Sequence, residues 1–249
     1  AVGDTLRILD ASFNDIRRLN PAMLRAMRRL ERVFLIHCKL RALPDDFGVL
    51  LPETLQVLEL GDNRLRSLQH ANLAACPSLT ELWVGRNKLE SLDGVCELPS
   101  LRVLSAQSNR LTSLQLTQLP SLQELYLSHN RVQRFSAESL ATCAHSLRVL
   151  DLAANHISDG LFEVLPTLRS LEQLWLNDND ISDWRILDLL AQLPNLTELY
   201  LERNPIQGQE RDKYRRRVLS RLPQLVQLDA LPVTPQERQR AAAVARLAS

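Results

Sequence analysis

Side chains that commonly carry chemistry are present in this sequence, but they lack the groupings that catalysis or metal binding requires. The five histidines do not gather with cysteines or carboxylates at metal-ligand spacing. The seven glycines form no phosphate-binding loop, and the serine, histidine and aspartate residues form no recognisable triad motif. We therefore expect no enzyme activity, no cofactor and no metal site.

The elements that would position any binding residues are set by a repeat. An eleven-residue phrase, Leu-x-x-Leu-x-apolar-x-x-Asn-x-apolar, can be laid over the chain nine times. It begins at Leu6, Leu30, Leu55, Leu79, Leu101, Leu122, Leu147, Leu171 and Leu196. A period in the low twenties with this pattern is typical of a leucine-rich-repeat solenoid. We number the first leucine of each phrase as position 1.

This repeat predicts an α/β solenoid: an arc with a concave parallel sheet and a convex side of short helices or 3₁₀ turns. We expect a single domain over residues 1–249, with nine repeats in 1–207 and a C-terminal cap and terminal helix in 208–249. The polar Asn at position 9 predicts a side-chain ladder that bonds backbone groups left unpaired by the turn. Cys38 replaces this Asn in the second repeat, where a small thiol also fits.

The two ends of the chain differ. Leu6 already belongs to a full repeat, so we expect earlier repeats or a cap to be missing. At the other end, a helix from about Gln209 would bury Tyr214, Val218 and Leu222, and Leu225 to Asp229 would form a truncated strand. Thr234 to Glu237 is a capping box, and it opens a final helix. Within that helix, the residues expected to pack on the last repeat are Ala241, Val244 and Leu247.

Composition narrows the class of partner. The formal net charge is +1, which argues against a nucleic-acid-binding face, and the basic run at 213–217 is interpreted as a solvated helix face. The sequence also bears on the compartment of the protein. No apolar run is long enough to span a membrane, and no signal peptide is recognised. The four cysteines show no pairing pattern, so we interpret them as reduced and buried, in an intracellular protein. We expect this protein to be a monomer.

The residues at position 5 of each phrase are the most informative about binding. Position 5 lies between two inward-facing residues on a strand, so it points outward from the core. We call these nine residues the concave column: Asp10, Phe34, Glu59, Trp83, Ser105, Tyr126, Asp151, Trp175 and Tyr200. Five are aromatic and three are acidic, which predicts a protein interface whose partner is rich in Lys and Arg. The alternative is that the rings stack on one another for stability.

The phrases LELGDNRL, LWVGRNKL, LSAQSNRLTSL, LYLSHN, LDLAANHI and LWLNDN resemble, in the same order, the regulatory subunit 7 family of protein phosphatase 1 regulators. The resemblance implies a non-catalytic regulatory subunit whose concave face contacts the phosphatase catalytic subunit, at times together with inhibitor 3, in nucleus and cytoplasm. It assigns the contacts to Asp10, Phe34, Glu59, Trp83, Asp151, Trp175 and Tyr200; the column adds Tyr126. One acidic contact of that family is Gln173 here.

Two other classes of function stay open. One is a cytoskeletal or axonemal scaffold that associates with dynein or tubulin, because such proteins share the repeat and the cap. The other is a scaffold in an RNA-processing particle, where the partner would be a protein rather than RNA.

Overall fold

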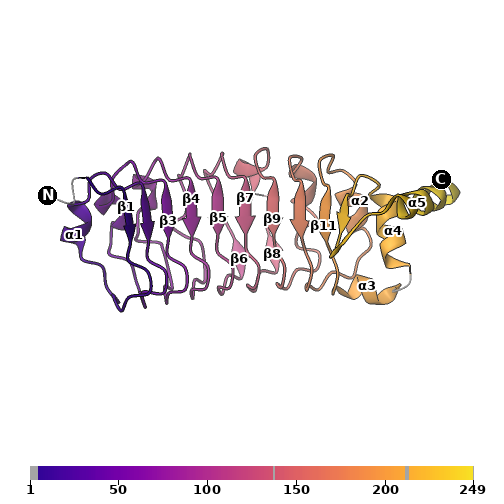
Figure 1. Cartoon of the computed structure of the whole chain (residues 1–249). Coiled ribbons are helices and arrows are strands. Elements are labelled where there is room, and N and C mark those ends of the chain that lie inside the picture. Colours follow the sequence, from indigo (N-terminus) through magenta and orange to yellow (C-terminus); the bar gives the residue numbers. More distant parts are fainter. Residues whose placement is uncertain (1–4, 137, 211–212, 249) are drawn as a thin grey trace.

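The computed structural model describes residues 5–136, 138–210 and 213–248, with side chains described up to residue 243. Each of the nine repeats contributes one strand to a single parallel sheet that runs the length of the molecule (Figure 1). These strands are β1 Ile8–Asp10, β2 Arg32–Phe34, β3 Val57–Glu59, β4 Glu81–Trp83, β5 Val103–Ser105, β7 Glu124–Tyr126, β9 Val149–Asp151, β10 Gln173–Trp175 and β11 Glu198–Tyr200. The predicted nine repeats and their parallel sheet are confirmed.

The opposite side of the solenoid is made of short, varied segments. It includes the helices α1 Pro21–Arg25 and α2 Ile186–Leu190 and 3₁₀ turns at Phe47–Leu50, Leu73–Ala75, Ala141–Cys143 and Leu165–Thr167. A second, two-stranded parallel sheet pairs β6 Ser113–Leu114 with β8 Arg134–Phe135, and it lies away from the main sheet in Figure 1. The short helices and turns were predicted, whereas this second sheet was not.

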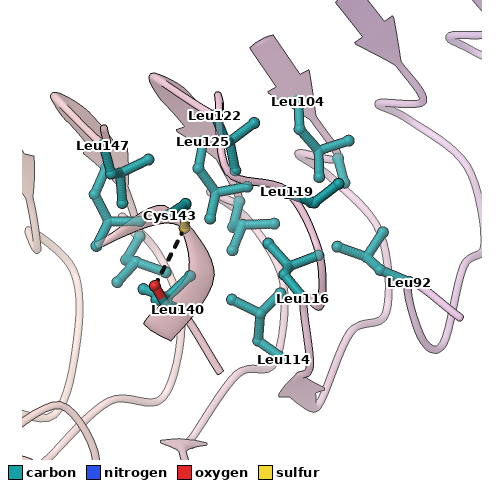
Figure 2. Close-up of a cluster of buried hydrophobic side chains, with 14 of the residues drawn as sticks. Leu92, Leu104, Leu114, Leu116, Leu119, Leu122, Leu125, Leu140, Cys143 and Leu147 are labelled. Carbon is teal, nitrogen blue, oxygen red and sulfur yellow. Dashed lines mark hydrogen bonds between the residues drawn. The ribbon is translucent and has the colours of Figure 1, made fainter. Parts of the chain in front are cut away.

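Leucine side chains from both sides fill the space between the sheet and the returning segments. Figure 2 shows this core around the fifth and sixth repeats, where Leu104 and Leu125 come from strands and Leu116 and Leu119 from the returning segment. All four are fully buried. Because each repeat packs its apolar residues against its neighbours, stability comes from contacts between repeats rather than within one.

The predicted asparagine ladder is present. The Asn87 side-chain amide donates to the carbonyl oxygens of Leu60 and Val84, both at 3.0 Å. Its oxygen accepts the Leu65 backbone N–H at 3.0 Å. Cys38 also behaves as expected, because its buried thiol donates to the Ala11 carbonyl oxygen at 3.2 Å. These bonds satisfy backbone groups that the turn would otherwise leave unpaired.

The residue before the ladder, at position 8, has a left-handed backbone in every repeat, with φ between 51° and 60°. His37 and His129 occupy this position and are exposed. None of the nine residues is glycine, although this conformation costs other residues about 1–2 kcal/mol. The ladder on one side and the strand on the other hold the turn in this shape.

The C-terminal cap begins earlier than predicted. In place of one helix from about Gln209, the structure has α3 Pro205–Gln209 and α4 Tyr214–Arg221. Pro205 occupies the first helical position, where its missing N–H costs nothing, so the helix starts directly after Asn204. Tyr214, Val218 and Leu222 are buried as expected.

Two short strands end the sheet on its C-terminal side, and the last helix follows them. The truncated strand is β12 Gln227–Leu228, which pairs in parallel with β11, and the unpredicted β13 Leu231–Pro232 turns back against it. In the capping box of α5 Pro235–Ala248, the Glu237 carboxylate accepts the Thr234 N–H at 2.9 Å and the Thr234 hydroxyl accepts the Glu237 N–H at 3.3 Å. Ala241 is buried; the side chains of Val244 and Leu247 lie outside the described residues.

At the opposite end, the apolar side chains of Ile8 and Phe13 are exposed. Residues 1–4 lie outside the described chain, so the expectation that earlier repeats or a cap are missing stays a prediction.

Candidate protein-binding face

The concave column forms one continuous line across the sheet. Asp10 is in register with Phe34, Phe34 with Glu59, and the alignment continues strand by strand through Trp175 to Tyr200. Neighbouring strands are roughly 4.8 Å apart, so consecutive side chains of the column lie within contact distance of one another. The register therefore brings together the residues that the sequence singled out.

Not every member of the column is exposed. Tyr126 and Trp175 flank Asp151 in register, and their ring centroids are 6.4 Å apart. Since two strand spacings separate their backbones, the rings lean together above the intervening strand. Asp151 is only 3% exposed and Ser105 only 2%, so the expectation that the column faces solvent throughout is wrong at these two positions.

Burial changes the chemistry of Asp151. Loss of solvent raises the pKa of its carboxyl, although hydrogen bonds from Ser128 and from the Ala153 N–H, 3.0 Å away, oppose this. The expected contact between Asp151 and a partner would require the rings of Tyr126 and Trp175 to move. The rings of Tyr126 and Trp175 do contact one another, tilted by 57°, and whether they serve stability or an interface stays open.

Tyr200 extends the same aromatic cluster. Its ring meets that of Trp175 edge-on, with centroids 5.7 Å apart, and its hydroxyl accepts a hydrogen bond from the Gln227 side-chain amide. Burial and the neighbouring carboxylates raise the pKa of the Tyr200 hydroxyl. The cap therefore fixes the last aromatic residue of the column.

Position 3 supplies a second set of polar residues on the same face. Glu81 accepts a hydrogen bond from Trp83 Nε1 at 3.1 Å, and Glu124 accepts one from the Tyr126 hydroxyl at 2.8 Å. In each case a carboxylate two residues earlier on the strand holds the polar atom of an aromatic ring. These bonds orient the rings along the concave face.

The third ring of this kind lacks such a partner. In β10 the equivalent of Glu81 is Gln173, and Trp175 Nε1 is buried without a hydrogen-bond partner, alone in this among the described side chains. An unsatisfied buried N–H costs about 1–3 kcal/mol. Unlike Glu81 and Glu124, Gln173 therefore does not hold the polar atom of the ring two residues later on its strand.

The N-terminal half of the column is more open. Asp10 is exposed and Phe34, Glu59 and Trp83 are half-buried. The Glu59 carboxylate accepts the Gly61 N–H at 2.9 Å, and burial raises the pKa of Glu59. Trp83 makes no contact with another aromatic ring among the described residues. Its indole is therefore available to a partner without disrupting an aromatic cluster.

Positions 3 and 5 together carry strongly one-sided charge. The acidic residues at these positions in the nine repeats are Asp10, Glu59, Glu81, Glu124, Asp151 and Glu198, and the one basic residue is Arg32. Sequence reasoning missed Glu81, Glu124 and Glu198, although the recurring tripeptide Glu-Leu-aromatic could have revealed them. Carboxylates among aromatic rings favour a partner surface with Lys and Arg.

Within residues 5–136, 138–210 and 213–248, no group of three or more His, Cys, Asp or Glu is arranged to hold a metal ion. No helix there is long and apolar enough to cross a bilayer. The four cysteines are free thiols, and three are buried. Cys96 is only half-buried, so the expectation that all four are buried is wrong for this residue.

The repeats and their parallel sheet define a leucine-rich-repeat solenoid, and its concave side carries the candidate binding residues. Three leucine-rich-repeat family models match the chain, over residues 53–111, 99–141 and 145–248. All three describe repeats, and none describes an enzyme.

Among curated proteins, the chain is similar to tubulin-specific chaperone E. It is 29% identical to the Danio rerio protein over 227 residues, which cover 75% of this chain and 44% of that protein. It is 26% identical to the Homo sapiens protein, over 67% of this chain and 44% of that one. The chain thus spans under half the length of these relatives.

The fold is also shared with solved structures. The leucine-rich-repeat domain of APL1 superposes with a TM-score of 0.69 at 23% identity, over 90% of this chain and 52% of that domain. The TLR13 chain in a complex with ssRNA13 gives a TM-score of 0.67 at 24% identity, over 84% of this chain and 30% of that one. At such identities the likeness concerns the fold alone.

Proposed function

We propose that this chain is a non-catalytic protein-binding module whose concave face holds a basic surface of a partner protein. The observation that carries the proposal is the single register of the concave column, in which aromatic and acidic side chains line one face of nine parallel strands. The glutamates at position 3 add negative charge beside that line. A face about 40 Å long, estimated from the strand spacing, suits a globular protein better than a small ligand.

Tubulin is the partner we propose first. The similarity to tubulin-specific chaperone E extends over three-quarters of this chain, and it supports the tubulin-associated scaffold over the other classes considered. Because the chain covers less than half of that relative, the proposal concerns tubulin binding by the solenoid and not the activity of the longer protein.

The catalytic subunit of protein phosphatase 1, with or without inhibitor 3, is the second candidate. It is favoured by the position of Trp83 and Trp175, which the resemblance assigns to phosphatase contacts and which share one register. Two observations count against it: Asp151 is buried, and Gln173 stands where the phosphatase regulators have an acidic residue. A location in nucleus and cytoplasm is proposed with either partner.

Titration calorimetry against purified tubulin dimer and against the phosphatase catalytic subunit distinguishes the two candidates. Trp83→Ala removes an aromatic ring that no other ring supports, and a hot-spot residue of this type contributes about 2 kcal/mol or more. That loss corresponds to binding weaker by about 30-fold. Glu198→Lys reverses a half-buried charge on the same face.

The matched control is Glu163→Lys, which makes the same charge change at an exposed residue beside the convex turn at Leu165–Thr167. We expect tubulin binding that Trp83→Ala and Glu198→Lys weaken and Glu163→Lys leaves unchanged. Binding of the phosphatase alone, with the same dependence on the concave face, would replace the first candidate by the second. Equal affinity of all variants for whichever partner binds would refute the assignment of the face.

A further inference from the structure

A row of basic side chains runs along one edge of the solenoid, outside the concave face. Position 10 of the second to sixth repeats, directly after the ladder residue, is occupied by Lys39, Arg64, Lys88, Arg110 and Arg131. We call these five residues the cationic row. Positions 9 and 11 on either side are buried, whereas the row is exposed or half-buried, so its side chains project from the edge.

Backbone hydrogen bonds hold the row in a regular line. The N–H of Arg64 donates to the Leu40 carbonyl oxygen of the preceding repeat at 2.8 Å, and Lys88, Arg110 and Arg131 repeat this bond, also at 2.8 Å. Consecutive members are therefore separated by one repeat, roughly 4.8 Å. Five cations at this spacing span roughly 20 Å.

Little negative charge compensates the row within the described chain. Lys39 is the one member in an ion pair, with Asp15 at 3.4 Å. Two further carboxylates are at neighbouring positions: Asp62, whose Oδ2 is 2.7 Å from His37 Nδ1, and the exposed Glu90 at position 12. Neither forms an ion pair with a member of the row among the described residues. Four cations of the row are therefore free to pair with a ligand.

The row ends in a hollow of about 830 Å³ near the N-terminal repeats. Its lining contains five basic residues and no acidic one: Arg17, Arg18, Lys39, Arg41 and Arg64. Arg17 is paired with Asp15 at 2.7 Å, whereas Arg18 and Arg41 have no side-chain partner among the described residues. The positive charge thus widens into a concave site at one end of the line.

We infer that the cationic row and this hollow form a docking surface for an acidic, Asp/Glu-rich polypeptide segment. Charge complementarity along a line suits a chain-like polyanion, because each step of the solenoid adds one cation. Single-stranded nucleic acid is disfavoured, since its binding also relies on aromatic side chains that stack on bases. Positions 8 to 12 of these five repeats contain no Phe, Tyr or Trp.

This inference is independent of the partner of the concave face. The probe is a fluorescein-labelled oligoglutamate peptide, and the readout is fluorescence anisotropy with the full chain at low and at physiological salt. The test variant is Arg64→Glu, Lys88→Glu, Arg110→Glu. The matched control, Arg102→Glu, Arg169→Glu, Lys213→Glu, reverses three exposed cations elsewhere and changes the net charge equally.

We expect the peptide to bind the wild-type chain and bind the row variant at least about tenfold more weakly, because three attractions become repulsions. The control should stay within about twofold, since none of its three charges belongs to the row or lines the hollow. Circular dichroism verifies that both variants fold. If both variants weakened peptide binding equally, the effect would come from net charge alone, and the inference would be wrong. A folded wild-type chain that ignores the peptide but binds an oligothymidine or anionic vesicles would also overturn the inference.

Discussion

The asparagine ladder makes a stability prediction that can be worked out bond by bond at Asn109. Its side-chain oxygen accepts the Leu89 N–H at 2.9 Å, and its amide donates to the carbonyl oxygens of Val84 and Ala106 at 3.0 and 2.9 Å. Asn109→Ala removes all of these bonds. The carbonyls retain a donor each, because Asn87 also bonds Val84 and Asn130 also bonds Ala106, both at 3.0 Å.

Only the Leu89 N–H is therefore left without a partner, and it is buried. An unsatisfied buried donor costs about 1–3 kcal/mol, and the small cavity left by the shortened side chain adds to this. We expect Asn109→Ala to lower the free energy of unfolding by about 2–3 kcal/mol. Urea unfolding, followed by circular dichroism, measures this change, provided that the slope with urea stays that of the wild type.

Asn14→Ala is the matched control. Asn14 occupies the same position in the first repeat, but it is exposed and its amide bonds only the nearby carbonyls of Ala11 and Ser12. No backbone N–H depends on it among the described bonds, so we expect a loss under about 1 kcal/mol. Similar losses for both variants would refute the reasoning, because they would show that the bond between repeats contributes nothing beyond the local turn.

Three further outcomes follow from the concave face and its turns. Gln173→Glu should offer Trp175 Nε1 a carboxylate acceptor of the kind that Glu81 gives Trp83, in place of an amide oxygen that makes no such bond. We expect the free energy of unfolding in urea to rise by about 1 kcal/mol, and an unchanged or lower value would contradict this assignment. Ala154 has a φ of 51°, so Ala154→Gly should leave the free energy of unfolding unchanged or raise it by up to about 1 kcal/mol. The backbone φ of Ala153 is not positive, so Ala153→Gly should lower the free energy of unfolding by about 0.5–1 kcal/mol. A change of the same sign in both variants would refute this reasoning. Because burial raises the pKa of Asp151, its proton is bound more tightly in the folded state, and stability is lost as the pH rises from about 4 through the raised pKa. Asp151→Asn should remove that loss, so unfolding measured across this range should depend less on pH in the variant than in the wild type.

The repeat architecture could be predicted because one periodic pattern fixes the strand, the turn and the ladder in every copy. The position of Leu104 in its phrase determined both its strand and its burial, and neighbouring copies determined the register. The cap was less predictable, since it occurs once and follows no period. Pro205 after Asn204 was nevertheless a readable sign that a helix begins there.

Whether a residue of the concave column is buried or exposed depends on its neighbours on the adjacent strands. A pattern defined within one repeat does not describe these neighbours. Ser105 stands between Trp83 and Tyr126, and Asp151 between Tyr126 and Trp175. Each small residue is flanked on both sides by a large aromatic one, and both are buried. The alternation of large and small side chains along the column was present in the sequence, and it could have predicted which residues the rings would cover.

Net charge failed as a guide for a similar reason. A formal charge of +1 argued against a basic face, yet it is the sum of two opposite surfaces on one scaffold. Carboxylates gather at positions 3 and 5, and Arg64, Lys88 and Arg110 project five or more positions later in their repeats. Because each repeat places these positions at a constant distance from each other, the cations of the second to sixth repeats lie along one line, apart from the carboxylates of the concave face, while the total charge stays near zero. A partner with a basic surface and an acidic segment could therefore engage both surfaces at once. The variants that reverse Glu198 on one surface and the cationic row on the other would then weaken its binding independently, with additive free energies.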